Sequence, residues 1–292
     1  YDDSINTAYL YIDGIFASSA IVNFNPSTSE ELTVGGNGTV SGDGGTVNVQ
    51  TSGIKTGGDM SATVAAHGVL AQSIGGGGGY GGMVSLDTPL SNFGTGLAMS
   101  SGTSTNGNGG DVSVTVDGFV KTTGGSSAGV IAQSVGGGGG IAGSATGSPA
   151  GARVGSAGGT GTAGVISVTV TQTGAVEQLG DSAYGIIAQS AGGSGTTTSN
   201  TAKVNIDFAG AVAANTEGAV GILAQSTGDG VGAVNIQVAS TGRIFGGTNG
   251  TAGTGAGIML LDGTGTNLID NAGLIQSFQP GADAVAISIS QG

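Results

Sequence analysis

The chain has 292 residues, of which 65 are glycine and four are proline, and it contains neither cysteine nor tryptophan. Its 5 Lys and Arg stand against 18 Asp and Glu, so the formal net charge is −13. So few basic residues cannot supply the positive surface that nucleic acid or anionic lipid requires. The absence of cysteine excludes disulfides and thiolate metal sites and suits an exported chain.

Apolar residues make up 37% of the chain and recur in strict alternation, which favours a regular array over disorder. No apolar run reaches the ~20 residues needed to span a bilayer as a helix. Because the chain begins at Tyr1 without a methionine or signal peptide, we interpret it as a piece of a longer exported protein.

The predicted elements follow one repeated order. Residues 1–45 form a divergent N-terminal unit, residues 46–227 contain the clearest repeats, and residues 228–292 continue them. Each unit opens with valine or isoleucine alternating with polar residues, the pattern of a strand with one buried face. A glycine and a short apolar step follow, and then a third apolar segment. The units are residues 9–24, 46–74, 111–135, 164–190, 203–226, 232–261 and 267–289.

Three short strands per unit, with no helical period, predict an all-β chain folded as a parallel β-helix of about seven coils. In this fold successive units stack like on like and pair their backbone groups. Glycines at the corners, such as Gly118 and Gly174, are expected there because glycine tolerates positive φ.

The third segment is the most regular one. It reads G-[VI]-[LI]-A-Q-S and occurs four times, with glutamine at positions 72, 133, 189 and 225. Successive glutamines are 61, 56 and 36 residues apart, so the excursions between units shrink while the unit stays constant. The long excursions are residues 75–110 and 136–163, and either an interaction surface or mobile spacers fit their glycine-rich composition.

The last unit indicates which face of the third strand is buried. There Val285, Ile287 and Ile289 alternate with smaller residues, and alignment with the copies turns Val69 and its equivalents inward. The glutamines then point outward beside an apolar stripe, which the excursions could cover. We predict a possible surface ladder of Gln72, Gln133, Gln189 and Gln225. In the opposite register they would form a buried amide ladder, each side chain bonded to the next.

Residues suited to catalysis are sparse. Asp111, Asp117 and Asp207 do not share a position in the unit. Five aspartates precede glycine, as they do in turns: Asp13, Asp43, Asp117, Asp229 and Asp262. Lys55 and Lys121 are expected to stack on adjacent units along a solvated edge. The single histidine, His67, has no counterpart in later copies. We therefore assign no catalytic, cofactor-binding or metal-binding residue.

The motif and its trailing glycines, as in Val69 to Gly79 and Val130 to Gly140, resemble the passenger region of large bacterial autotransporters of the type V secretion pathway. The resemblance covers nearly all of residues 46–227. It implies a right-handed parallel β-helix on the surface of a Gram-negative cell, exported through the periplasm and anchored in the outer membrane by a C-terminal barrel outside these residues. Such proteins commonly act as adhesins in aggregation, biofilm formation or virulence.

Three functions remain open on the sequence. The first is a non-enzymatic surface module, either an adhesin segment or a stalk displaying a binding region, with a host or neighbouring-cell protein or glycan as its partner. The second is a carbohydrate-active β-helix enzyme, a polysaccharide lyase or hydrolase, favoured by the acidic balance. The third is self-association through exposed strand edges.

Overall fold

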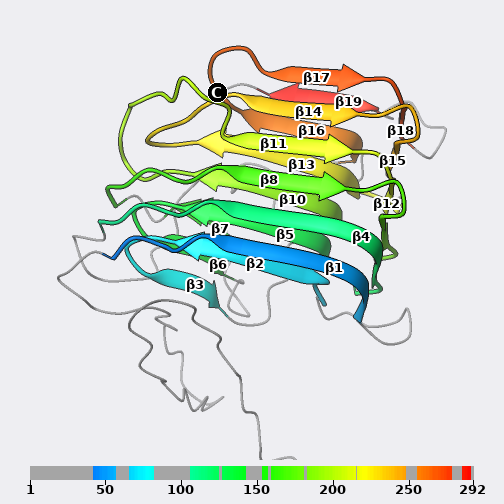
Figure 1. Cartoon of the computed structure of the whole chain (residues 1–292), viewed down its shortest axis with the longest axis horizontal. Helices are drawn as coiled ribbons and strands as arrows, with labels where there is room; N and C mark the ends of the chain where they lie inside the picture. The colour runs from blue at the N-terminus through cyan, green and yellow to red at the C-terminus, as the bar shows by residue number, and fades with distance from the viewer. Residues whose placement is uncertain are drawn as a thin grey trace, which may run out of the picture.

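The computed structural model describes residues 42–56, 66–81, 106–124, 127–142, 153–156, 159–180, 183–214, 216–247, 255–277 and 285–290. Every regular element in these ranges is a β-strand, so the prediction of an all-β chain is confirmed for them. The expected first unit, residues 9–24, lies outside the described residues. The six later units are all present, and each contributes to three stacked rows of strands (Figure 1).

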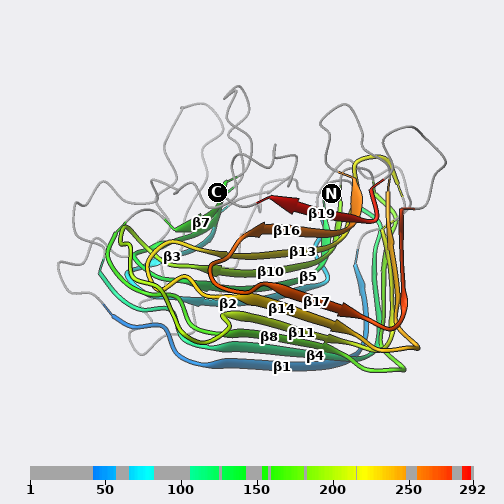
Figure 2. The same ribbon diagram turned by 90° about the horizontal axis from the view of Figure 1, so that it is seen from above.

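The rows are seen side by side when the stack is viewed from above (Figure 2). The first row is formed by β1 (Val47–Thr56), β4 (Val112–Thr122), β8 (Ile166–Val170), β11 (Val204–Phe208), β14 (Val234–Val238) and β17 (Leu268–Asn271). The third row is formed by β2 (Val69–Ile74), β5 (Ala128–Val135), β10 (Tyr184–Ala191), β13 (Val220–Thr227), β16 (Ala256–Asp262) and β19 (Ile287–Ser290).

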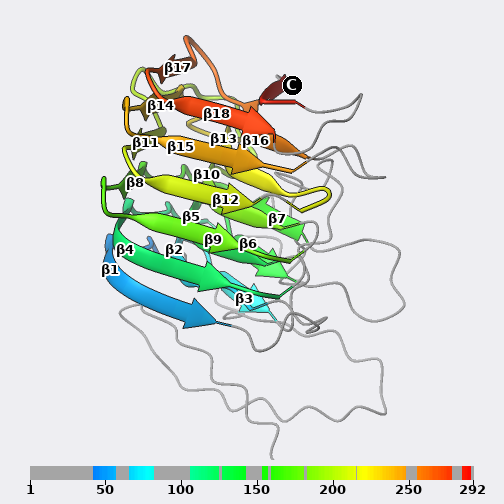
Figure 3. The ribbon, with the colours of Figure 1, turned by 90° about the vertical axis from the view of Figure 1, so that its right-hand side faces the viewer.

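The second row joins the other two and faces the viewer in Figure 3. It contains β9 (Ala175–Gln178), β12 (Ala211–Ala214), β15 (Arg243–Gly246) and β18 (Leu274–Ser277). In the first two described units, β1 and β4 run through the corner and supply both the first and second rows. The expectation of separate strands is therefore wrong for these two units. A register shift between Thr51 and Gly53 marks the bend.

Equivalent residues stack directly on one another in all three rows. Neighbouring strands within each row are parallel, and Gln133, for example, pairs with Gln189 while Val114 pairs with Val168. The alternating valines and isoleucines point inward, where Val114, Val168 and Ile206 are almost completely buried in one core shared by the three rows. Val69 and Ala71 face the same core, which confirms the inward register predicted for the third strand.

Glycine occupies these corners because the neighbouring unit leaves no space for a side chain, not because the backbone there has positive φ. None of Gly118, Gly174 and Gly210 has positive φ. A Cβ at Gly118 would lie 2.0 Å from the carbonyl oxygen of Ser52, and one at Gly210 would lie 2.1 Å from that of Gly174. Our φ-based expectation is therefore wrong at these corners, because the backbone of the neighbouring unit occupies the site of a side chain.

The glycines that open the third-row motif form a second column of this kind. A Cβ at Gly185 would lie 2.4 Å from the Gly221 oxygen and 2.4 Å from Val212 Cγ2. Gly129 and Gly221 likewise face a glycine oxygen and a core side chain of the next unit. Positive φ is required instead in the glycine runs that follow the motif, for example 84° at Gly76 and 74° at Gly137.

These glycine runs lead into the excursions, and they are ordered where they leave the third row. β3 (Gly78–Gly81) pairs in parallel with β6 (Gly139–Ala142), and β6 pairs antiparallel with β7 (Arg153–Ser156). Gly138 N donates to Gly75 O at 2.7 Å, so the two runs also stack on each other. This small sheet could not be predicted from the sequence, because glycine runs have no side-chain periodicity.

We expect Gly185→Ala to lower stability by about 1–3 kcal/mol, because the new methyl group overpacks a backbone oxygen and a core valine. The midpoint of urea unfolding, followed by circular dichroism, measures the change. Gly53→Ala is the matched control, since a Cβ there meets nothing within 4 Å. Equal midpoints for the two variants would contradict the close packing of the glycine column.

Candidate functional site

The four predicted glutamines form one continuous chain of side-chain hydrogen bonds. Gln72 Nε2 donates to Gln133 Oε1 at 2.7 Å, and Gln133 Nε2 donates to Gln189 Oε1 at 2.6 Å. Gln189 Nε2 then donates to Gln225 Oε1 at 2.7 Å. Every amide points the same way along the stack. We call this column the glutamine ladder.

The ladder points away from the central core, as predicted, but it is not a surface ladder. Gln133 and Gln189 are 0% exposed and Gln225 is 1% exposed, while Gln72 at the end is partly exposed. The expected solvent exposure is therefore wrong for three of the four residues. The glutamines point outward and yet form stacked amide hydrogen bonds, an arrangement predicted only for the inward register.

A second apolar cluster buries the ladder on the outer face of the third row. Ile131, Ile187, Leu223 and Met259 form its stripe, and Ile141 of β6 packs into the same cluster. Gln133 Nε2 also approaches Gly140 O at 3.4 Å. The start of the excursion at residues 136–163 thus packs against the stripe and covers apolar side chains that would otherwise face solvent.

A carboxylate terminates the ladder. Gln225 Nε2 donates to Asp262 Oδ2 at 2.8 Å. Asp262 pairs with Ser226 in the strand register, and it reaches the ladder because its backbone is turned to a φ of 57°. Among the described residues it is the one non-glycine residue with positive φ. Asp262 precedes Gly263, a dipeptide that in sequence indicates only a turn.

The serine that follows each glutamine has a separate structural role. Ser73 Oγ donates to Gly45 O at 2.6 Å and accepts from Gly110 N at 2.8 Å. Ser134 accepts from Gly164 N, and Ser190 donates to Gly164 O, both at 2.8 Å. Each serine thus ties the end of its third-row strand to the start of a first-row strand. The A-Q-S motif is explained by packing and hydrogen bonding alone.

The charged residues are dispersed, as the sequence predicts. Lys55 and Lys121 do stack on adjacent units, and Lys121 Nζ pairs with Glu177 Oε2 at 2.6 Å. Lys203 Nζ donates to Ala163 O at 2.7 Å. Within the described ranges, no group of three or more His, Asp or Glu side chains could hold a metal ion.

His67 takes part in the packing of the third row. Its Nδ1 accepts a hydrogen bond from Ala128 N at 2.9 Å, and the ring is partly buried. It follows that Nε2 carries the proton in the neutral ring. This arrangement fits the interpretation of His67 as a partly packed residue of one unit.

Asp117 stands at the corner of β4 and accepts two hydroxyl hydrogen bonds from the next unit. Thr171 Oγ1 donates to Asp117 Oδ1 at 2.7 Å, and Thr173 Oγ1 donates to the same oxygen at 2.9 Å. These bonds hold the pKa of Asp117 below its ordinary value of 3.8, with Thr171 the larger cause. They favour the ionised form because a carboxylate accepts them better than a carboxylic acid does.

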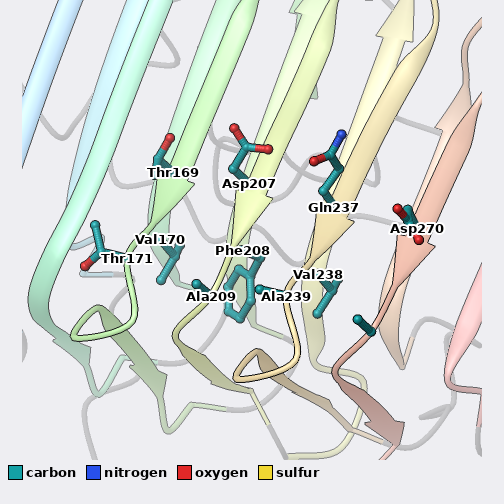
Figure 4. A pocket seen from close by; sticks show the side chains of 11 residues that line it. Thr169, Val170, Thr171, Asp207, Phe208, Ala209, Gln237, Val238, Ala239 and Asp270 are labelled. Carbon is teal, nitrogen blue, oxygen red and sulfur yellow. The ribbon is translucent and has the colours of Figure 1, made fainter.

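An open groove of about 330 Å³ lies beside this corner, on the outer side of the first row (Figure 4). Its polar side carries Thr169, Asp207, Gln237 and Asp270, which the strand register places in one line across β8, β11, β14 and β17. Its other side carries Ala209, Ala239 and Ala272. We call this feature the first-row groove. Asp207 faces outward as predicted, but its alignment with Gln237 and Asp270 was not foreseen.

No known protein family, curated protein or solved structure shows significant similarity to this chain. The described part of the chain contains no helix long and apolar enough to cross a membrane.

We expect Gln189→Leu to destabilise the protein by about 2–5 kcal/mol. The change leaves Gln133 Nε2 and Gln225 Oε1 without their ladder partners, and each buried unpaired polar group costs about 1–3 kcal/mol. Gln72→Leu is the matched control, because it removes one bond at the partly exposed end of the ladder. Denaturant midpoints measure both variants. A loss in Gln189→Leu no larger than in Gln72→Leu would show that the ladder is not continuous.

Asp117 should contribute stability that is present above pH 3.8 and is lost as the pH falls through its lowered folded-state pKa. A carbon-detected NMR titration of the Asp117 carboxyl measures that pKa directly. We expect the double variant Thr171→Val, Thr173→Val to raise it toward the ordinary value. Thr169→Val, at the end of β8 two residues before Thr171 and without a bond to Asp117, should leave it unchanged. A titration that the double variant does not move would contradict this assignment.

Proposed function

We propose that the chain is a right-handed parallel β-helix from the passenger of a bacterial autotransporter, displayed on the cell surface as an adhesin segment or as a stalk for a binding region. The observation that supports this most is the in-register parallel stacking of all three strand rows over six units. A stack of this kind extends by adding units and needs no domain-sized core of another type.

The distribution of polar groups supports a non-enzymatic role. The most regular polar feature, the glutamine ladder, is buried and satisfied internally, and so are the motif serines. The acidic surface and the grooved first row offer contacts for a glycan or protein of a host or neighbouring cell, or for a second copy of the chain. The expected partners do not include nucleic acid, because basic residues are too few.

The surface role predicts that antibodies raised against the purified chain label intact cells that produce the parent protein. Proteinase treatment of these cells should remove the label, and a deletion strain should lack it. Labelling that appears only after permeabilisation would contradict surface display. Beads coated with the chain then separate an adhesin, which retains cells on the beads, from a stalk, which does not.

A carbohydrate-active enzyme is the second candidate, and the first-row groove is the observation that favours it. Asp207 and Asp270 are two strand positions apart, roughly 10 Å at the usual strand spacing, near the separation of the carboxyl groups in inverting glycosidases. The groove lining contains no histidine, lysine or arginine that could assist proton transfer. Release of reducing ends from a polysaccharide, abolished by Asp207→Asn, would favour the enzyme over the surface module.

A further inference from the structure

The first-row groove carries three polar side chains that have no hydrogen-bond partner among the described residues. The glutamine ladder, the motif serines, Asp117 and Lys121 all bond to neighbouring units. The side chains of Asp207, Gln237 and Asp270 make no hydrogen bond to any other described residue, and all three are exposed. These carboxylates and this amide therefore offer their full hydrogen-bonding capacity to a ligand.

The shape of the groove follows from the residues next to this polar line. Ala209, Ala239 and Ala272 stand two positions after Asp207, Gln237 and Asp270 in three successive units. Their small side chains leave a hollow with a methyl-lined side next to the polar side. Thr171 bounds the groove at one end, where its hydroxyl is already bonded to Asp117. In Figure 4 the carboxylates of Asp207 and Asp270 and the amide of Gln237 are aligned along it.

The charge of the groove restricts its ligand. Its lining contains two aspartates and no basic residue, and the whole chain carries a net charge of −13. An anionic polymer lying along the polar side of the groove would meet like charges at Asp207 and Asp270. A protonated amine would form charge-assisted hydrogen bonds with the same carboxylates.

We propose that the first-row groove binds an extended glycan whose sugar residues carry free amino groups. The polar line repeats at about 4.8 Å, the usual distance between strands, so it presents hydrogen-bonding groups at short regular intervals to a straight polymer. Sugar rings have hydroxyl groups beside apolar C–H faces, which match the polar and alanine sides of the groove. Amino groups on the sugar meet Asp207 and Asp270.

A glycan fits better than a cationic peptide. Extended peptides are usually bound by adding a strand to a sheet edge or by filling apolar side-chain pockets. Here the polar line lies on the face of the first row, where the backbone groups of β11 and β14 are already paired on both sides. This inference rests on the proposed surface role for its biological setting and specifies the class of partner.

The test is calorimetric titration of the whole purified chain, at mildly acidic pH, with an oligomer of glucosamine. We expect binding that weakens with added salt, and weaker binding of the fully N-acetylated oligomer. The double variant Asp207→Asn, Asp270→Asn should lose roughly five- to tenfold in affinity, as expected for two solvent-exposed charge contacts. Glu217→Gln, which removes an exposed carboxylate at a different corner, should bind like the unaltered chain.

Ala239→Leu separates the shape of the groove from its charge. The larger side chain fills the hollow without changing any charge, and we expect it to weaken binding as well. Absence of binding by the glucosamine oligomer, unchanged affinity in both the double variant and Ala239→Leu, or equally tight binding of oligolysine would overturn the inference. Such a failure is distinct from failure of the surface role, which the labelling of intact cells tests.

Discussion

The glutamine ladder is the interaction on which the arrangement of the units most depends. A buried amide must find both a donor and an acceptor, and in this chain each glutamine finds them in the units on either side. The column is satisfied only while the units stay in register, since a slip by one residue would turn every glutamine into the core. Its ends need other solutions, which are the partly exposed Gln72 and the carboxylate of Asp262.

Close backbone approach is the second constraint, and it explains where the sequence may vary. The corner glycines Gly118, Gly174 and Gly210 and the glycines that open the motif leave no room for a side chain. The motif serines join the third row to the first. A unit therefore cannot gain residues inside its strands or at these corners. Insertions are accommodated after the glutamine strand, which is where the spacing between units falls from 61 to 36 residues.

Much of the fold could be predicted from local pattern. Alternation of valine with polar residues located the first-row strands, and the last unit gave the correct orientation of Val69 and Gln72. The features that were missed depend on contacts between distant residues. Gln133 is buried partly by a glycine-rich excursion without periodicity, and the crowding at Gly118 comes from Ser52, in the preceding unit.

The candidate sites likewise include some residues that local pattern predicts and others that depend on the folded backbone. The glutamines were identified by repetition, but the role of Asp262 as their terminal acceptor depends on a backbone turned to positive φ, which the sequence Asp-Gly does not reveal. The groove could not be predicted from the sequence, because it depends on the strand register that aligns Asp207, Gln237 and Asp270. Repetition in the sequence therefore marks what holds the units together, whereas the unbonded polar groups of the groove occupy one position at which the residue type differs between units.

Hydrogen exchange of the side-chain amides tests the central claim most directly. If the ladder is continuous and buried, the Nε2 protons of Gln133, Gln189 and Gln225 exchange slowly with solvent in NMR experiments, while those of the exposed Gln50 and Gln237 exchange rapidly. Rapid exchange at Gln133 and Gln189, at the rate of the exposed amides, would show that the glutamines are open to solvent and that the ladder does not hold the units in register.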